Sequence, residues 1–370
     1  MVVQASVMEA PGSLSPASRR SVELVDSLDG LREDWMRLAA ESGNAFATWE
    51  WNELWWRHYG GGRRLRVAVS SQDDGRVDAI VPLFMWARRP LRIVRLIGHG
   101  HGDRLGPICV GGPQSERRAF RLALDALPHD LFVGDWVAGD LDWAGVLRGR
   151  VVRQTGYPIL RFPEGSWTEF LAGQSQRFRK SARNSRNRLE REHDVSYRSA
   201  DSATLEADLD TAFRLHRIRF REHSGCLFCG DQEPFQREFA ALAFQRGWLR
   251  LLLMELDGTP ASFEYGFMVG DAYFAYQGGR DPAWDKHSVG FVLELESIRR
   301  SVEEGATEYR FLGGEEGYKY RFSTEDPGLE TVVAPATRRG SIAAAAVDTV
   351  WHVPGGKAAL RRIGTAKASP

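Results

Sequence analysis

The fold is decided by one stretch, Gln277-Gly278-Gly279-Arg280-Asp281-Pro282-Ala283-Trp284-Asp285-Lys286-His287-Ser288-Val289-Gly290. It follows the β-type run 272–276 and opens a long helical pattern near Ser288. A loop between a strand and a helix start presents unpaired backbone N–H groups and the positive end of the helix dipole, which suits the phosphates of a nucleotide-containing cofactor. The loop is neither a Walker loop nor a G-x-G-x-x-G fingerprint, so its residues alone do not identify the ligand. The expected cofactor contacts are Gln277, Gly279, Arg280, Lys286, His287, Ser288, Val289 and Gly290.

The segments around this loop predict a mixed sheet. Strand-like runs at 249–256, 261–269 and 272–277 are separated by turn signals, which predicts a three-strand antiparallel meander. A helix at 288–304 and a strand at 309–312 follow. A strand, a crossover helix and a second strand make a parallel pair, which adds a parallel strand to the antiparallel sheet. Further helices are predicted at 176–192, 205–222 and 233–245.

The first half repeats this order of elements without a visible sequence repeat. Strand-like runs at 65–70 and 77–85 flank the turn Asp73-Asp74-Gly75. A strand at 91–97, a helix at 115–127 and strands at 131–137 and 157–162 follow. The expected fold class is therefore α/β, with two tandem domains that are each a mixed, mostly antiparallel sheet flanked by helices. The expected divisions are a disordered leader over 1–20, domains over 21–163 and 164–336, and a tail over 337–370.

The overall composition gives no signal for a nucleic-acid or membrane partner. The chain has 370 residues, and its 49 Lys and Arg balance its 49 Asp and Glu, so no global charge points to a nucleic acid or a membrane surface. No apolar run reaches the roughly 18 residues needed to span a bilayer, so no integral membrane association is expected. The three cysteines form no obvious disulfide framework. This favours a reducing interior and predicts a cytoplasmic protein.

The second half contains a motif that resembles a known family. It reads Gly279-Arg280-Asp281-Pro282, Ser288-Val289-Gly290 and Tyr309-Arg310-Phe311-Leu312-Gly313-Gly314-Glu315-Glu316-Gly317-Tyr318-Lys319-Tyr320-Arg321-Phe322. This order resembles the CelD/FemAB-like branch of the GNAT acyltransferases, in which two GNAT-type domains lie in tandem. In the first half, the segment 46–51 and Leu96-Ile97-Gly98 followed by Asp103 resemble the family's first domain. The chain departs from the usual pattern at Arg310, Gly313 and Phe322, where the family usually has Asp, a larger residue and Trp.

The resemblance implies an N-acyltransferase. The co-substrate would be an acyl-CoA such as acetyl-CoA, and the acceptor an amine of a small molecule or a saccharide precursor. The amine would attack the thioester directly, without a covalent enzyme intermediate and without a metal. One alternative is a FemAB-like transferase that takes its donor group from aminoacyl-tRNA. Another is a GNAT-like module that binds a ligand without catalysis. The sequence does not indicate the oligomeric state.

The resemblance also nominates catalytic and substrate-binding residues. Tyr318 is a candidate acid for the leaving thiolate, and Glu316 matches the same motif. Lys319 is a candidate contact for an anionic substrate group, and Asp103 could face the cleft between the domains. Glu264 interrupts an apolar strand; it is solvated if the aromatic residues beside it face the core, and a candidate base if its own face lines the cleft.

Two further patterns stay open. The predicted helix 176–192 carries seven basic residues, including Arg179 and Arg183, and is either a solvated face or a binding site for phosphates or RNA. The spacing His223-x2-Cys226-x2-Cys229 is that of metal ligands, with His216 as a conceivable fourth. Structural zinc normally takes four ligands, so the preferred interpretation is a substrate-side loop with two thiols.

Overall fold

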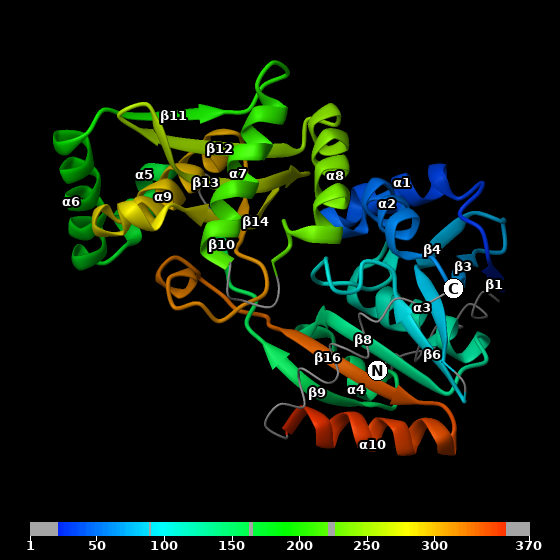
Figure 1. The fold of residues 1–370 in the computed structure, drawn as a ribbon. Coiled ribbons are helices and arrows are strands. Elements are labelled where there is room, and N and C mark those ends of the chain that lie inside the picture. The colour runs from blue at the N-terminus through cyan, green and yellow to red at the C-terminus, as the bar shows by residue number, and fades with distance from the viewer. Residues whose placement is uncertain (1–20, 89, 163–165, 221–225, 353–370) are drawn as a thin grey trace, which may run out of the picture.

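The computed structural model describes residues 21–88, 90–162, 166–220 and 226–352. The chain forms an α/β structure with one four-stranded and two six-stranded sheets, flanked by helices (Figure 1). This confirms the expected fold class. No helix in these described ranges is long and apolar enough to cross a membrane.

The four-stranded sheet is built by the first hundred or so residues and is antiparallel throughout. The expected turn at Asp73-Asp74-Gly75 joins its two central strands, and Gly75 adopts a positive φ of 83° that suits glycine. The strands, in spatial order, are β1 (Ser21–Val25), β3 (Val67–Ser71), β4 (Val77–Val81) and β7 (Ile108–Cys109). The neighbouring helices are α1 (Arg32–Ser42), α2 (Trp49–Tyr59) and α3 (Gly112–Ala126).

The first six-stranded sheet is antiparallel except for one pair, β6 with β8. Its strands, in spatial order, are β2 (Arg64–Leu65), β5 (Leu83–Arg88), β6 (Leu91–Leu96), β8 (Leu131–Ala138), β16 (Leu329–Pro335) and β9 (Arg150–Thr155). The short helix α4 (Trp143–Val146) precedes β9, and α10 (Arg338–His352) packs on β16, β8 and β9.

The second six-stranded sheet also has a single parallel pair, β14 with β15. Its strands, in spatial order, are β10 (Ile159–Arg161), β15 (Glu308–Arg310), β14 (Ala272–Arg280), β13 (Thr259–Val269), β12 (Leu249–Leu256) and β11 (Val195–Ser199). Strands β12 to β14 are the expected meander, and α9 (Val289–Glu303) is the expected crossover helix. The other helices are α5 (Trp167–Gly173), α6 (Gln176–Glu192), α7 (Leu205–Phe220) and α8 (Glu233–Gln245).

Two strands, β10 and β16, lie on the other side of the expected domain boundary at 163 from the sheet they join. Strand β10 belongs to the second six-stranded sheet, and β16 belongs to the first, between β8 and β9. The chain therefore crosses between the two sheets and returns. Residues 338–346, expected as part of a tail, belong to helix α10 and contribute to the core. Ala344 is 3% exposed and lies in a core cluster with Val333 of β16. The alanine-rich composition that suggested a tail suits a helix packed closely on a sheet.

The two faces of the second six-stranded sheet are both covered. Phe263 and Tyr265 of β13 contact Phe228, which packs on Phe213 of α7, while Phe267 contacts Phe239 of α8. On the other face, Leu252, Met254 and Ala261 form a core cluster with Val289, Val292 and Leu293 of α9. In a strand that is covered on both faces, nearly all successive residues are buried, and this is the pattern of β13.

Candidate active site between strands β14 and β15

The parallel pair of the second sheet diverges after three residue pairs. Strand β14 extends over nine residues, but only 272–274 pair with 308–310 of β15. The chain after β15 turns away, because the N–H of Phe311 bonds to the carbonyl of Pro158 and that of Gly314 to Gly156. No ladder to β15 extends along the rest of β14 in the described residues. We call this divergence of the two strands beside residues 275–280 the gap.

A β-bulge lies in β14 where this gap begins. Tyr265 is opposite Gln277 and Gly266 is opposite Ala275, so Tyr276 is the extra residue on β14. The bulge places two successive side chains on the face covered by α7 and α8. Gln236 of α8 donates to the hydroxyl of Tyr276, and His216 of α7 bonds to Gln277. A bulged residue leaves the regular ladder and redirects its backbone groups. Gln277, expected as a cofactor contact, thus directs its side chain to α7.

The first turn of α9 lies beyond the end of β14. Ser288 has a positive φ of 57°, and its N–H bonds to the carbonyl of Asp285 through the 3-10 helix Pro282–His287. Its carbonyl accepts from the N–H groups of Phe291 and Val292. The N–H groups of Val289 and Gly290 precede the regular helical bonds and are those that a helix start offers to an anion. A Cβ on Gly290 would meet only the Cδ of Arg280, at 3.7 Å.

Two arginines flank this turn, and one was not expected from the sequence. Arg280 at the end of β14 forms an ion pair with Asp285. The guanidinium of Arg321 lies 4.3 Å from the ring centroid of Phe291, in the first turn of α9. Two cations beside a helix start strengthen its attraction for anions. Arg321 could have been nominated only from the contact, since it is eleven residues beyond the end of β15 in sequence.

The two residues before Ser288 contact helix α6. His287 is 5% exposed and lies beside Glu192 and His193 at the end of α6. Burial and the neighbouring charges of His193 and Lys286 lower the pKa of His287, so its imidazole is neutral near pH 7. The backbone carbonyl of Lys286 accepts a hydrogen bond of 2.6 Å from Arg188 of α6, while the side chain of Lys286 is exposed. The loop is thus fastened to α6 rather than free.

The motif after β15 forms a compact loop. The Nζ of Lys319 donates to the carbonyls of Leu312 and Gly313 and pairs with Glu316 at 3.0 Å. Lys319 is 6% exposed, which favours a loop-fastening role over the expected substrate contact. Tyr318 is 40% exposed, so its hydroxyl can approach a bound molecule. Glu316 is exposed and holds Lys319.

Two of the departures from the family pattern make contacts with the first half. A Cβ on Gly313 would lie 1.8 Å from the ring of Trp136, so only glycine fits against this tryptophan. Trp136 itself has a positive φ of 60°, a strained conformation for an aromatic residue. Arg310 stacks over Phe274 and donates to the carbonyl of Gly43. Both departures therefore fit the junction between the halves.

Asp103 brings the first half to the gap. Its carboxylate accepts the N–H of Gly313 at 2.7 Å, directly after β15, and its charge acts on Tyr276 in the bulge of β14. Burial raises the pKa of Asp103 to about 6, although the Gly313 bond and the charge of Lys319 oppose this. Asp103 therefore lies at the mouth of the gap with a carboxylate that titrates close to neutral pH.

Glu264 is not solvated. It is opposite Leu252 on the face that α9 covers, and it is 6% exposed. Its carboxylate oxygen lies 2.9 Å from where a Cβ on Gly278 would be, beside the part of β14 that does not pair with β15. The argument for a solvated Glu264 assumed that only the aromatic face of β13 is buried, whereas both faces are.

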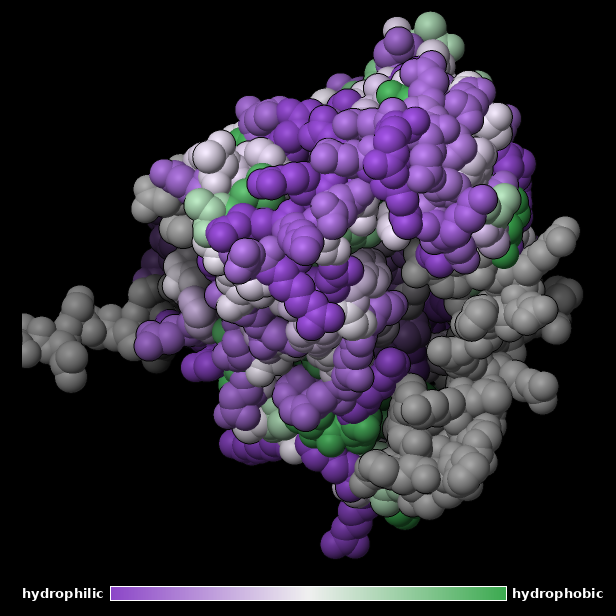
Figure 2. Space-filling model, turned by 90° about the vertical axis from the view of Figure 1, so that its left-hand side faces the viewer, coloured by the Kyte–Doolittle hydropathy of each residue, from purple (hydrophilic) through white to green (hydrophobic). Residues whose placement is uncertain are grey.

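The basic helix α6 lies at one end of the second sheet (Figure 1). Arg179 donates to the carbonyls of Ala172 and Gln174 and so caps α5. Arg183 is exposed, and Arg186 pairs with Glu190. Figure 2 shows the side of the molecule that carries α6, and hydrophilic residues cover most of it. Most of the helix is therefore a solvated face, while Arg188 connects it to the α9 loop.

A cavity of about 270 Å³ lies on the first-half side of β15. Arg310 contributes from the second sheet, and the first half supplies most of the remaining wall. Its charged residues are Glu41, Arg104, Glu116 and Arg310. Arg104, the residue after Asp103 in sequence, is part of this wall.

Comparisons with known proteins concern the fold. The family model described as an acetyltransferase (GNAT) domain matches residues 176–320. No curated protein matches the chain. Among solved structures, FemX is similar with a TM-score of 0.60 and 12% identity, covering 83% of this chain and 96% of FemX.

Two more solved structures share the fold over most of their length. A conserved protein of unknown function from Bacteroides thetaiotaomicron has a TM-score of 0.55 and 14% identity, covering 86% of this chain and 100% of that one. L-PGS from Bacillus licheniformis has a TM-score of 0.51 and 13% identity, covering 87% and 97%. These identities establish the fold alone. The family match concerns residues 176–320, so the likeness to an acetyltransferase (GNAT) domain lies in the second half.

Proposed function

We propose that the protein is an N-acyltransferase of the CelD/FemAB-like branch. It moves an acyl group from acyl-CoA, with acetyl-CoA as the simplest donor, to an amine of a small molecule or saccharide precursor. The observation that carries the proposal is the divergence of β14 from β15 below the first turn of α9. A gap in a sheet edge that ends at a helix start suits a long, thin molecule with an anionic head.

The residues around the gap fit such a donor. The N–H groups of Val289 and Gly290, with Arg280 and Arg321 beside them, would hold the diphosphate. Gly290 has no side chain, so the diphosphate could approach the backbone closely; a Cβ there would meet only Arg280. The part of β14 that lies beyond its pairing with β15 would run alongside the pantetheine arm. When bound, the thioester supplies the acyl carbon that the amine attacks.

The proton chemistry is assigned to Asp103. Near pH 7 its carboxylate is mostly ionised, and its pKa of about 6 lets it accept a proton from an attacking amine. As the C–N bond forms and the C–S bond breaks, the N–H groups at the bulge around Tyr276 would stabilise the charge on the carbonyl oxygen. The thiolate that leaves would take a proton from Tyr318, whose hydroxyl is accessible. Glu264 remains a second candidate base because it lies beside Gly278.

The acceptor is assigned to the cavity beside Arg104 and Arg310. Its volume of about 270 Å³ is close to the lower end of the range for small-ligand pockets, roughly 300 Å³. Because it carries both acidic and basic groups, it suits an amine that also bears an anionic group. A cytoplasmic location and the identity of the acceptor stay predictions.

A panel of acyl-CoA donors with pooled amines, read out by the free thiol released, tests the proposal directly. We expect acetyl-CoA to raise the melting temperature, as any ligand of the native state does, and to release CoA only when an amine is present. If no acyl-CoA shifts the melting temperature and no thiol appears, the proposed donor is wrong.

A second candidate takes its donor group from aminoacyl-tRNA. It is favoured by the exposed basic residues of α6, including Arg177, Lys180 and Arg183. Binding of tRNA that weakens steeply with salt, together with no response to acyl-CoA, would support it. If acetyl-CoA binds but no amine in any screen releases CoA, the third candidate, a ligand-binding module without catalysis, is favoured.

A further inference from the structure

A pair of cysteines lies on the side of the sheet away from α9. Cys226 and Cys229 are joined by a disulfide, with α carbons 5.5 Å apart, in the segment before α8. Both residues are partly exposed. Phe228, between them in sequence, is fully buried and packs on Phe213 and His216 of α7. The segment is therefore held against the core while its two sulfur atoms stay near the surface.

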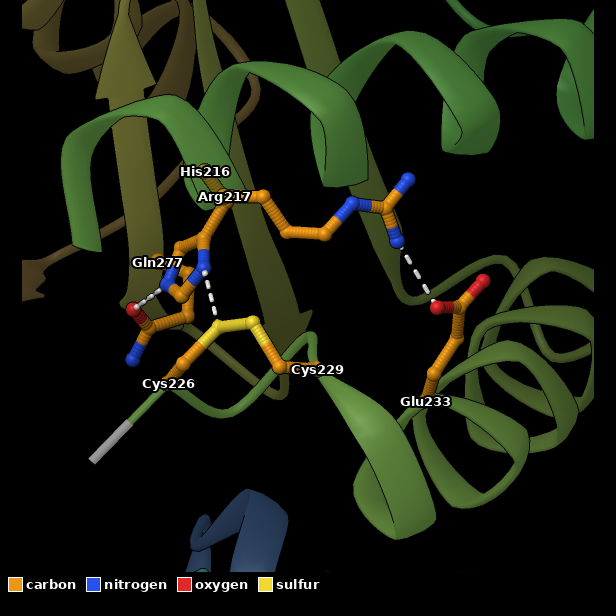
Figure 3. The surroundings of a disulfide bond; sticks show 6 residues. All are labelled: His216, Arg217, Cys226, Cys229, Glu233 and Gln277. Carbon is orange, nitrogen blue, oxygen red and sulfur yellow. Dashed lines mark hydrogen bonds and ion pairs between the residues drawn. A yellow bond between two sulfur atoms is a disulfide. The ribbon is translucent and has the colours of Figure 1, made fainter. Parts of the chain in front are cut away.

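His216 links this pair to the second sheet. It is 1% exposed, and Figure 3 shows its ring between Gln277 of β14 and Cys226. Its Nε2 lies 3.0 Å from the side-chain oxygen of Gln277, and its Nδ1 lies 3.4 Å from the sulfur of Cys226. Because an amide oxygen can only accept, Nε2 must carry the proton and donate it. In the neutral ring, Nδ1 is then the acceptor, and it faces sulfur.

We propose that Cys226 and Cys229 form a redox-active dithiol/disulfide site whose substrates are low-molecular-weight disulfides, with His216 as the base for Cys226. The geometry distinguishes the two sulfurs, since His216 contacts Cys226 and Figure 3 shows Cys229 on the far side of the bond. A thiol beside a basic nitrogen is present as thiolate at lower pH than a free cysteine, and the thiolate is the attacking form. This site is separate from the proposed acyl transfer, so either can fail without the other.

The exchange is balanced without any other reactant. In the reduced protein, the Cys226 thiol gives its proton to Nδ1 of His216, and the thiolate attacks a disulfide RSSR. This forms a mixed disulfide and releases one thiolate RS⁻, which takes up that proton. Cys229 then attacks the sulfur of Cys226, which closes the protein disulfide and releases the second RSH. The protein dithiol is oxidised by two electrons and RSSR is reduced to two RSH.

A metal ion is the competing explanation. The ligand-type atoms of His216, Cys226 and Cys229 lie within 4.8 Å of one another. His223, the further residue of this motif, lies outside the described residues. Three protein groups leave a position open, whereas a closed structural zinc site needs four, and the sulfurs are already bonded to each other. The disulfide therefore favours the redox interpretation.

Trapping of the mixed disulfide tests the proposal. The Cys229→Ser variant of the full chain, reduced and then treated with glutathione disulfide, should accumulate glutathione on Cys226, seen by mass spectrometry. The Cys226→Ser variant should react at Cys229 at least about ten times more slowly, because that thiol lacks the base. Cys109→Ser is the matched control and should leave both rates unchanged. Faster reaction at Cys229 would overturn the assignment of the attacking thiol.

His216 is tested by the pH dependence of the same reaction. In the natural chain, alkylation of Cys226 should stay fast below the pH at which free cysteine loses reactivity, about 8.5. His216→Asn should lower the rate at pH 7 by about tenfold and move the profile toward that of free cysteine. If this variant does not fold, the pH dependence of Cys226 alkylation in the reduced natural chain still tests the role of His216. The proposal would be overturned if that pH dependence matched free cysteine. It would also be overturned if each reduced chain bound one zinc ion tightly and the zinc blocked exchange.

Discussion

The two six-stranded sheets each contain one parallel pair, and the two pairs end differently. In the first sheet, β6 and β8 pair over Ile93–Leu131 and Val94–Phe132. The residues that follow fill the space between them, because Arg95 and His99 both pair with Asp135. Although burial opposes it, His99 and Arg95 lower the pKa of Asp135 to about 2, so Asp135 and Arg95 form an ion pair at neutral pH, while burial lowers the pKa of His99.

In the second sheet the chain turns away from β14 after β15, and the charged groups at that point are Asp103, which accepts from Gly313, and Lys319, which pairs with Glu316. The two parallel pairs have the same topology. In the first half, side chains fill the space between the strands, whereas in the second half the same place is the candidate binding gap. The difference teaches that the topology alone does not make a site, because side chains that fill the space between diverging strands remove it. It also explains why the first half contributes Asp103 to the second half's gap instead of a site of its own.

The largest expected effect is at the group that connects the two halves. Asp103→Asn keeps an acceptor for the N–H of Gly313 but removes the base, so turnover should fall by about a thousandfold. In the natural enzyme, kcat/KM should fall about tenfold for each pH unit below 6. Steady-state kinetics across pH measure both. Asp125→Asn, which removes an exposed carboxylate paired with Arg121, should change neither.

Asp103 also gives a stability test with a defined sign. Its folded pKa of about 6 is above the ordinary value of 3.8, so the folded state binds this proton more tightly. The associated stability is present at low pH and is lost as pH rises through about 6. Asp103→Asn should therefore be at least as stable as the natural chain at pH 8, by urea unfolding. Marked destabilisation there would mean that the carboxylate is structural.

A charge in the first turn of each crossover helix compares the halves directly. Gly290→Asp should weaken acetyl-CoA binding at least about a hundredfold, because a carboxylate repels the diphosphate while the space at Gly290 accepts the side chain. Gln114→Asp makes a similar change in the first turn of α3, where Gln114 is exposed, and should leave binding unchanged. Calorimetry gives both affinities. Equal effects in the two helices would contradict the assignment of the gap to the second half.

The contact between Trp136 and Gly313 tests whether the halves are fitted to each other. Gly313→Ala should destabilise the protein by about 2 kcal/mol, because the new methyl overlaps the indole ring. Trp136→Leu should relieve the overlap, so the double variant should be less destabilised than the sum of the single ones. Urea unfolding measures the coupling. Gly317→Ala, which meets nothing within 4 Å, is the control and should be near neutral.

The smallest expected effect is at the proposed acid. Tyr318→Phe should lower turnover by about tenfold and change KM little, since the hydroxyl acts on the leaving thiolate rather than on binding. Tyr320→Phe is a matched control, because Tyr320 is about as exposed as Tyr318 and its hydroxyl donates to Asp326. If both variants keep full turnover, Tyr318 is not the acid.

The sequence predicted the elements of the second half well because their signals are local. The spacing of apolar residues in 176–192 and the turns at Gly258 and Gly270 depend on neighbours within a few positions, and α6 and the meander match them. The return of β16 to the first sheet depends on a partner nearly two hundred residues away, and no local pattern contains that information.

The candidate site divides in the same way. The helix start at Ser288 and the motif around Tyr318 were nominated from local order and resemblance. The engagement of Lys319 and the burial of His287 were not, because each depends on groups brought in by the fold. The match between Gly313 and Trp136 likewise joins residues that only the tertiary structure places in contact.

A crystal structure of the protein with coenzyme A tests the central claim most directly. The account predicts the diphosphate within hydrogen-bond distance of the N–H groups of Val289 and Gly290, and the pantetheine arm along residues 275–280 of β14. A cofactor bound at β6 and β8, or a gap that stays closed at saturating coenzyme A, would contradict it.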